Sequence, residues 1–180
     1  MIKTDFKLQY ETRDVADDGI PVIIVAAGLS TRMGGINKQT ALLCGIPVIA
    51  RTLKVFENSR YISRIILVTQ SKLIPEMQSI AEKYMISKLT DIVEGGADRH
   101  VSVMCGIERL TENEDKVLIQ DGARPFATAG MISRCVAALH NYDGCLCGMK
   151  ITDTVKRVDE ACNVVDTLDR TYLYAATLTP

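Results

Sequence analysis

Short apolar segments that alternate with helix-like segments constrain the fold of this chain more than any other feature of its sequence. The first, PVIIVAAG, starts at Pro21, is rich in β-branched residues and ends at Gly28, which is typical of a buried strand. Further strands are predicted over residues 64–69, 91–93, 116–120 and 144–151. Apolar residues at helical spacing predict helices over residues 47–58, 72–84, 99–111 and 131–141.

This alternation, with short connections, predicts an α/β fold in which a mostly parallel sheet is covered by helices on both faces. Residues 20–150 are expected to form this domain. Such sheets bind ligands in the crevice outside the carboxyl ends of their strands. The residues directly after each predicted strand are therefore the candidates for a functional site.

Composition narrows the class of protein. A length of 180 residues is typical of one compact domain. Apolar residues make up 47% of the chain and charged residues 24%, and this composition excludes a wholly disordered protein. With 21 basic against 22 acidic side chains, the net charge of −1 gives no basic surface for general nucleic-acid binding. The longest apolar stretch has about ten residues, half of what a membrane span requires. Residues 1–19 lack the apolar core of a secretory signal and are interpreted as an N-terminal extension that could lack fixed structure, so a cytoplasmic protein is expected.

The six cysteines form no C-x-x-C pair, which makes a zinc site improbable. Because most of them lie in apolar segments, we expect reduced thiols that pack in the core. The residues concerned are Cys44, Cys105, Cys135, Cys145, Cys147 and Cys162.

The loop after the first strand, AAGLSTRMGGINKQ, covers residues 26–39. Its small residues allow close approach of the backbone to a ligand, Gly28 permits a positive φ, and successive N–H groups can bind an anion. The guanidinium of Arg32 can donate two parallel hydrogen bonds to phosphate oxygens, and Lys38 adds a mobile positive charge. The loop matches neither a Walker A motif nor a dinucleotide fingerprint, so an ordinary strand-to-helix turn stays open as an alternative.

Two further loops follow predicted strands. In EGGADRHVS, residues 94–102, the glycines permit close contact and Ser102 lies near a helix start, although a turn with Asp98 as helix cap is the alternative. In QDGARPF, residues 120–126, Asp121 is placed to hold a metal or a substrate hydroxyl, or else is a turn residue. A backbone cradle, two cations and an acidic group together favour phosphoryl or nucleotidyl transfer.

The two histidines, His100 and His140, are isolated, so a hydrolase triad has no support. A phosphate monoester nucleophile, with a second pKa of about 6, needs no general base. The segments ITDTVKRV and NVVDTLDR flank a turn-like DEAC and predict a charged β-hairpin arm that leaves the domain.

The motifs AAGLSTRMG with NKQ, GGADRHVSV, DGARPF, TDTVKR and LDR occur in this order. In this set, from Ile20 to the last residue, the chain resembles the cytidylyltransferases of the methylerythritol phosphate pathway of isoprenoid synthesis. The resemblance implies a Rossmann-like, nucleotide-diphospho-sugar transferase-like fold with a protruding arm. It also implies transfer of CMP from CTP to 2-C-methyl-D-erythritol 4-phosphate, with Mg²⁺ bridging the triphosphate and pyrophosphate released.

The resemblance also implies roles for individual residues. Arg32 and Lys38 would be catalytic, neutralising the triphosphate and the charge of the transition state. Asp121 would lie beside the metal and the substrate. The nucleotide pocket would be lined by Ala26, Ala27, Gly28, Gly96, Arg99 and Ser102.

The resemblance further implies that the arm, residues 151–172, embraces a second subunit in a homodimer. Thr154 and Arg170 would contact the substrate phosphate across that dimer. Thr179, in competition with Thr177, would add a further substrate contact. Relatives continue beyond Pro180, so residues 173–180 are expected to begin a C-terminal part that this truncated chain lacks.

Two alternatives stay open. A ribitol-5-phosphate cytidylyltransferase would share the CTP site and differ in its acceptor, a different sugar-alcohol phosphate. A non-catalytic, truncated nucleotide-binding dimer would keep the fold without turnover.

Overall fold

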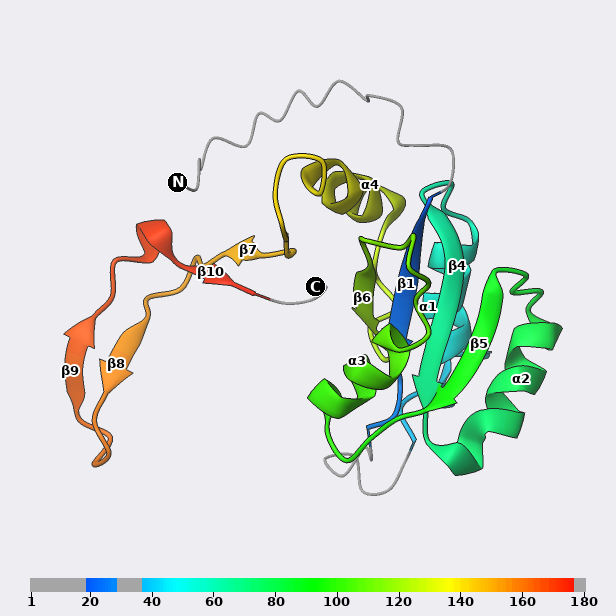
Figure 1. The fold of residues 1–180 in the computed structure, drawn as a ribbon. Coiled ribbons are helices and arrows are strands. Elements are labelled where there is room, and N and C mark those ends of the chain that lie inside the picture. The colour runs from blue at the N-terminus through cyan, green and yellow to red at the C-terminus, as the bar shows by residue number, and fades with distance from the viewer. Residues whose placement is uncertain (1–18, 29–36, 177–180) are drawn as a thin grey trace.

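The computed structural model describes residues 19–28 and 37–176, and its centre is a parallel sheet of four strands (Figure 1). The strands stand in the order β5-β4-β1-β6, with bounds β1 Ile20–Val25, β4 Ile62–Thr69, β5 Leu89–Glu94 and β6 Leu118–Asp121. In the register, Val25 of β1 lies opposite Val68 on one side and Asp121 on the other. The predicted parallel sheet is confirmed.

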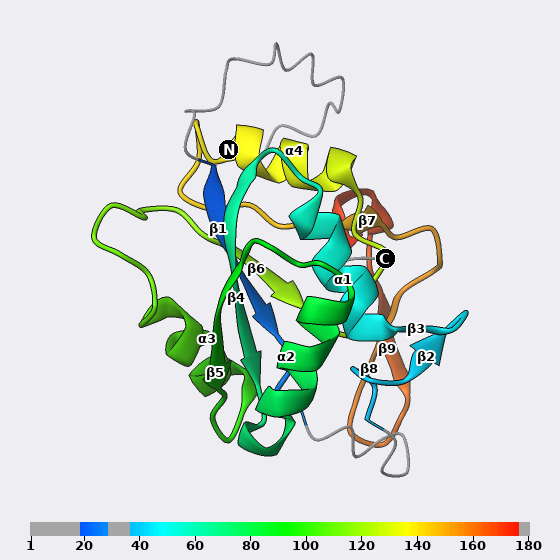
Figure 2. The same cartoon turned by 90° about the vertical axis from the view of Figure 1, so that its right-hand side faces the viewer.

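Helices cover both faces of the sheet, as predicted (Figure 2). Val22 and Ile24 of β1 pack toward α1, α2 and α4, whereas Ile23 and Val25 pack toward α3. Because successive side chains of a strand point to opposite faces of the sheet, a strand that is apolar at every position can pack against helices on both faces. The helices are α1 Val48–Glu57, α2 Ile74–Lys83, α3 Arg99–Ile107 and α4 Ala129–Ala138, with a short 3₁₀ turn, η2 Ser71–Leu73, before α2.

The predicted helix over 99–111 ends early. α3 stops at Ile107, and the chain then turns so that the Glu114 carboxylate accepts the backbone N–H of Thr111 at 2.7 Å. A hairpin of two short strands, β2 Leu42–Leu43 and β3 Ile46–Pro47, was not predicted. Its two central residues, Cys44 and Gly45, have φ of 50° and 76°, as the tight primed turn between such strands requires.

The predicted strand over 144–151 is wrong for most of its length. Only β7, Met149–Lys150, is a strand, and it pairs antiparallel with β10, Tyr174–Ala175, outside the main sheet. The apolar run that suggested a buried strand lies at the surface, where Leu146 and Met149 are exposed. The expectation of core thiols is wrong for most of the six cysteines: Cys105 is half-buried and packs against the core, Cys135 and Cys147 are half-buried outside it, and Cys44, Cys145 and Cys162 are exposed.

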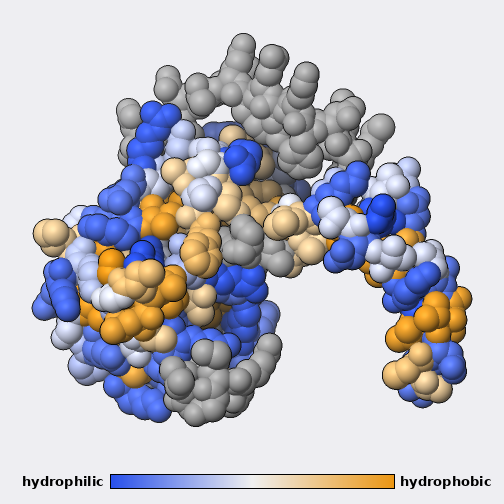
Figure 3. Space-filling view, turned by 180° about the vertical axis from the view of Figure 1, so that it is seen from behind, coloured by the Kyte–Doolittle hydropathy of each residue, from blue (hydrophilic) through white to orange (hydrophobic). Residues whose placement is uncertain are grey.

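The predicted hairpin arm is present. β8, Lys156–Val158, pairs antiparallel with β9, Val164–Thr167, and the 3₁₀ turn η3, Arg170–Tyr172, leads back to β10. The arm projects away from the sheet in Figure 1, and Figure 3 shows apolar side chains along it. The exposed large apolar residues of the hairpin are Val158, Val164 and Val165.

Gly106 lets α3 lie directly on the sheet. A Cβ at this position would stand 2.5 Å from Cγ2 of the fully buried Ile23. We expect Gly106→Ala to lower the free energy of unfolding by about 1–3 kcal/mol, because overpacking forces the helix off the strand. Denaturant titration measures the change. The matched control is Gly130→Ala in α4, whose nearest neighbour is the flexible Arg134 tip at 3.4 Å, and it should leave stability unchanged or raise it by up to about 1 kcal/mol.

Arg64 of β4 fixes the segment that follows α3. Its guanidinium donates to both carboxylate oxygens of Glu114, at 2.8 and 2.6 Å, and to Asp91 at 3.0 Å. The hydrogen bond from Arg64, followed by those from Thr111 and by the charge of Arg64, lowers the pKa of Glu114 from 4.5 to about 2. Because the folded pKa lies below the unfolded one, the stabilisation is present above pH 4.5 and is lost as the pH falls toward 2.

Replacing Glu114 with glutamine should therefore lower the free energy of unfolding at pH 7 by about 1–3 kcal/mol. The difference between the variant and the wild type should shrink as the pH falls from 4.5 toward 2. Glu112→Gln, at an exposed neighbouring position, is the control, with an expected change within about 0.5 kcal/mol. A Glu114→Gln difference that stays constant across this pH range would contradict the assignment.

Candidate functional site

Three loops meet at the carboxyl ends of the central strands. Each is tied to the neighbouring strand where it begins: Ala26 N donates to Val68 O at 2.7 Å, Gly95 N to Thr69 O at 2.8 Å and Gly122 N to Val25 O at 2.8 Å. The chain crosses from β1 toward β4 on one side, while β6 lies on the other side of β1. A crevice between the loops is expected at this reversal of strand order.

Small residues let these loops approach one another. A Cβ on Gly95 would stand 2.4 Å from Cβ of Ala27 and 2.8 Å from Oγ of Ser102, so the loop after β1, the loop after β5 and the start of α3 touch there. A Cβ on Gly96 would stand 2.1 Å from Cγ1 of Val101. The structure thus brings Ala27, the Gly95–Gly96 pair and Ser102 into one place, while the buried Ala26 lies against the turn at Gly122, where an added Cβ would stand 3.0 Å from it.

Asp98 caps α3, as the alternative interpretation of this loop predicted. Its carboxylate accepts the backbone N–H of Val101 at 2.9 Å, and its carbonyl accepts the hydroxyl of Ser102 at 2.8 Å. Capping does not exclude the binding of an anion at the positive N-terminal end of α3, which lies beside the loop after β1.

The loop after β1 is anchored at both ends of its described part. The carbonyl of Gly28 accepts a hydrogen bond from Gln70 Nε2 at 3.1 Å, and Gly28 does not use the positive φ that the sequence allowed. On the far side, Asn37 Oδ1 accepts the N–H of Gln39 at 2.9 Å, which fixes the turn that carries the half-buried Lys38. Arg32 lies outside the described residues.

Asp121 holds two arginines. Its Oδ1 accepts from Nε and Nη2 of Arg99 at 3.1 and 3.0 Å, and its Oδ2 accepts from Nε of Arg124 at 3.1 Å. The buried Gln120 carboxamide donates to the carbonyls of Asp121 and Arg124 at 3.2 and 3.1 Å, which holds the turn. Two guanidinium groups are therefore gathered at the carboxyl end of β6, where an anion would be attracted.

These contacts make Asp121 a poor metal ligand in this arrangement, since both carboxylate oxygens already accept from a guanidinium. Within residues 19–28 and 37–176, no group of three or more His, Cys, Asp or Glu side chains could hold a metal ion. The residues that the structure describes do not fit a resident metal.

Sequence reasoning did not single out three residues of this site. Arg124 follows Asp121 in the same motif, and Gln70 follows β4 directly, so the rule that functional residues follow strands could have found both. Gln39 gave no signal: it is 6% exposed, and its Oε1 has no hydrogen-bond partner among residues 19–28 and 37–176. A Cβ on Gly122 would stand 2.9 Å from that oxygen, which places Gln39 under the turn after β6.

The arm residues are not part of this cluster within one chain. The arm lies away from the sheet and its loops (Figure 1). Thr154 and Arg170 are exposed on it, and Arg170 donates a hydrogen bond to the carbonyl of Thr152. Thr179 lies outside the described residues.

Comparison with known proteins gives a consistent result. Residues 20–180 match the family model described as 2-C-methyl-D-erythritol 4-phosphate cytidylyltransferase. A protein of that name from Alkaliphilus metalliredigens is 39% identical over 158 residues, which cover 87% of this chain and 66% of the relative. Another from Geobacter metallireducens is 42% identical over 143 residues, 77% of this chain and 62% of the relative.

Solved structures agree in fold. The crystal structure of 4-diphosphocytidyl-2C-methyl-D-erythritol synthase from Anaerococcus prevotii matches with a TM-score of 0.77 and 29% identity, over 89% of this chain and 67% of that one. The chain thus spans about two thirds of the length of such relatives. In the part of the chain that the structure describes, no helix is long and apolar enough to cross a membrane.

Proposed function

The chain belongs to the 2-C-methyl-D-erythritol 4-phosphate cytidylyltransferase family, and on that premise we propose that it transfers CMP from CTP to 2-C-methyl-D-erythritol 4-phosphate with release of pyrophosphate. The observation that carries the proposal is the cluster at the carboxyl ends of the strands. There a cradle of small residues and the start of α3 lie next to an aspartate that holds two arginines. Such a cluster suits a polyphosphate and an anionic acceptor.

In the proposed reaction, an oxygen of the acceptor phosphate attacks the α-phosphorus of CTP. The new bond joins that oxygen to the α-phosphorus, and the bond between the α-phosphorus and the bridging oxygen of pyrophosphate breaks. Because a phosphate monoester with a second pKa of about 6 is largely ionised at neutral pH, no side chain need remove a proton. Positioning and charge neutralisation carry the rate.

We propose the following roles for the chain's own residues. Backbone groups of Ala26, Ala27 and Gly28 line the nucleotide, with Gly96 and Ser102 on the opposite side. Arg99, held by Asp121, contributes charge at the phosphates, and Arg32 and Lys38 stabilise the transition state. Mg²⁺ bound to the triphosphate would supply further positive charge, while the described residues offer it no resident site.

The arm completes the proposal. We propose a homodimer in which residues 151–172 contact a second copy, so that Thr154 and Arg170, both exposed here, reach the acceptor phosphate of the neighbouring site. Exposed Val158, Val164 and Val165 give the hairpin apolar surface for that contact. Since both substrates are highly charged, the proposed location is the cytoplasm.

Acceptor choice tests the proposed function. Pyrophosphate release is measured with CTP and Mg²⁺ in the presence of 2-C-methyl-D-erythritol 4-phosphate, of ribitol 5-phosphate or of no acceptor. Release with the first acceptor alone is the expected result. Release only with ribitol 5-phosphate would assign the chain to that other reaction, and CTP binding without release would identify a nucleotide-binding protein without turnover.

A further inference from the structure

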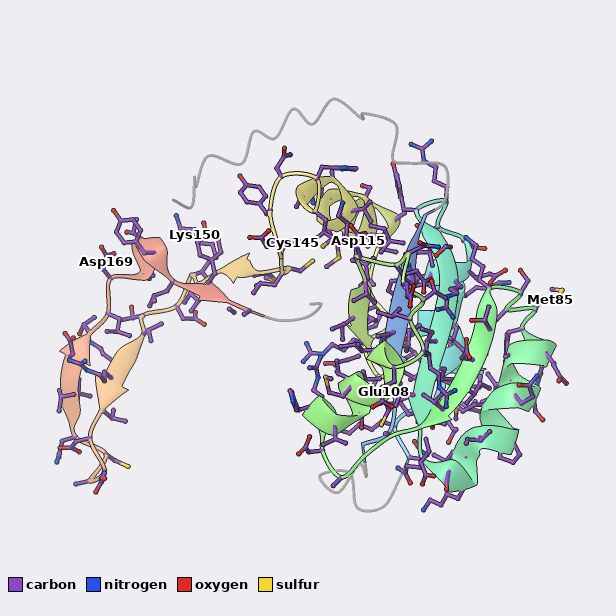
Figure 4. All side chains as sticks on the ribbon, viewed as in Figure 1. Met85, Glu108, Asp115, Cys145, Lys150 and Asp169 are labelled. Atoms are coloured by element: carbon purple, nitrogen blue, oxygen red, sulfur yellow. The ribbon has the colours of Figure 1, made fainter. Side chains whose placement is uncertain are left out.

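Three cysteine thiols gather where α4 meets the segment that leads to the arm. Sγ of Cys135, in α4, lies 3.6 Å from Sγ of Cys147, and Cys145 donates a hydrogen bond from its Sγ to the carbonyl of Cys135 at 3.4 Å. Figure 4 shows Cys145 beside α4, at the start of the path to β7. This cluster lies apart from the loops at the carboxyl ends of the strands and has no part in the proposed reaction.

The sulfur atoms do not make a metal site. Within residues 19–28 and 37–176, which include all three thiols, no three His, Cys, Asp or Glu side chains are placed to hold a metal ion. The closest pair, Cys135 and Cys147, has the more direct chemistry of two neighbouring thiols, which is oxidation to a disulfide.

We propose that Cys135 and Cys147 form a reversible disulfide when a small-molecule disulfide of the oxidised glutathione type is in excess. A disulfide bond is about 2.0 Å long, so the two sulfur atoms must close by about 1.5 Å. Residues 142–148 belong to no helix or strand, which leaves Cys147 free of ladder hydrogen bonds that would resist this movement.

The step balances as a thiol–disulfide exchange. The thiolate of one cysteine attacks a sulfur of the reagent, its S–S bond breaks, and one reagent thiol leaves. The thiolate of the second cysteine then attacks the protein sulfur of the mixed disulfide, and the second reagent thiol leaves. Two protein S–H bonds are lost, one protein S–S bond forms, and the reagent takes up both electrons and both protons.

The reagent has access to the pair. Cys135, Cys145 and Cys147 line a groove of about 370 Å³ between β6, α4 and residues 143–147. Burial raises the pKa of the Cys135 thiol, and also that of Cys145, so both stay protonated in neutral solution. Exchange should therefore be slow, and the pair should stay reduced until the oxidant is in excess.

The bond would link α4, which packs on the sheet, to the stem of the arm, which is formed by the strand pair β7 and β10. Ile132 and Val136 hold α4 in the core, while Cys147 is two residues from β7. β7 pairs with β10, and Ile151 N donates to Leu173 O at 3.1 Å, so the two sides of the arm join at this stem. A disulfide at this point restricts how the arm moves relative to the sheet.

Incubation of the whole chain with oxidised glutathione, followed by thiol titration and peptide mass spectrometry, tests the inference. The number of free thiols should fall from six to four, with a cross-linked peptide that joins Cys135 to Cys147, and a dithiol should reverse both changes. Hydrogen exchange in residues 142–148 should slow in the oxidised chain. Six remaining thiols, a cross-link between another pair, or only a mixed disulfide on Cys145 would overturn it.

Variants sharpen the test. Neither of the single variants Cys147→Ser and Cys135→Ser should lose two thiols to an internal disulfide. Circular dichroism checks that each variant is folded. Cys162→Ser is the matched control, because that exposed cysteine lies at the tip of the hairpin, and it should still lose two thiols. A Cys147→Ser chain that is folded and still forms an internal cross-link would contradict the assignment of the pair.

Discussion

Replacing Lys38 with alanine should lower kcat by about a hundredfold to a thousandfold while the dissociation constant of CTP rises far less. The reason is that a cation placed at the reacting phosphates stabilises the charge of the transition state more than that of the bound substrate. The turn that carries Lys38 is fixed on both sides: Asn37 Oδ1 accepts the N–H of Gln39 at 2.9 Å, and the carbonyl of Gln39 accepts the N–H of Ile49 at 2.9 Å, next to the start of α1. Steady-state kinetics with CTP binding measured separately would separate the two effects.

The matched control for Lys38 is Lys83→Ala, at the end of α2, which removes the same charge far from the site. It should leave kcat within about twofold of the wild type, in line with a remote surface substitution. A Lys38→Ala chain that keeps its kcat but binds CTP much more weakly would place Lys38 in ground-state binding instead.

Gly95→Ala should reduce CTP affinity and turnover together, by about a hundredfold in kcat/KM, because a displacement of about 1 Å at a reaction centre costs that much. The new Cβ would stand 2.4 Å from Cβ of Ala27, which belongs to the backbone cradle and cannot rotate away, and 2.8 Å from Oγ of Ser102. The loop after β1 and the start of α3 must then separate. Calorimetric titration with CTP measures the loss of affinity.

Gly144→Ala is the control for Gly95→Ala, since apart from its two chain neighbours no atom of residues 19–28 and 37–176 lies within 4 Å of the added Cβ. Its CTP affinity should equal that of the wild type. If Gly95→Ala is folded by circular dichroism and binds CTP as the wild type does, then the nucleotide does not lie in this cradle.

Sequence patterns predicted the elements whose signals are local. β1 is apolar at every position and packs on both faces, and α1 buries Ile49, Leu53 and Phe56 as its helical spacing indicated. The prediction of a buried strand over residues 144–151 is wrong, because an apolar run can lie at the surface when the strand that pairs with it comes from a distant part of the chain. Here that partner is β10, some twenty-five residues along the sequence from β7.

The candidate site likewise contains features that the sequence could predict and features that it could not. The loops after β1, β5 and β6 could be predicted because parallel strands bring their carboxyl ends together, and the contact of Gly95 with Ala27 and Ser102 agrees with that rule. The ion pair between Asp121 and Arg99 could not be predicted, because it depends on how close the start of α3 comes to β6. The burial of Gln39 Oε1 likewise could not be predicted, because it depends on how the turn after β6 packs against this side chain.

The most direct test of the central claim is ³¹P NMR of the chain with CTP, Mg²⁺ and 2-C-methyl-D-erythritol 4-phosphate. The proposed reaction predicts that the phosphomonoester signal disappears while a diphosphate diester and pyrophosphate appear in equal amounts. Unchanged CTP and phosphomonoester, in a sample where calorimetry shows that CTP is bound, would contradict the claim that this chain transfers CMP.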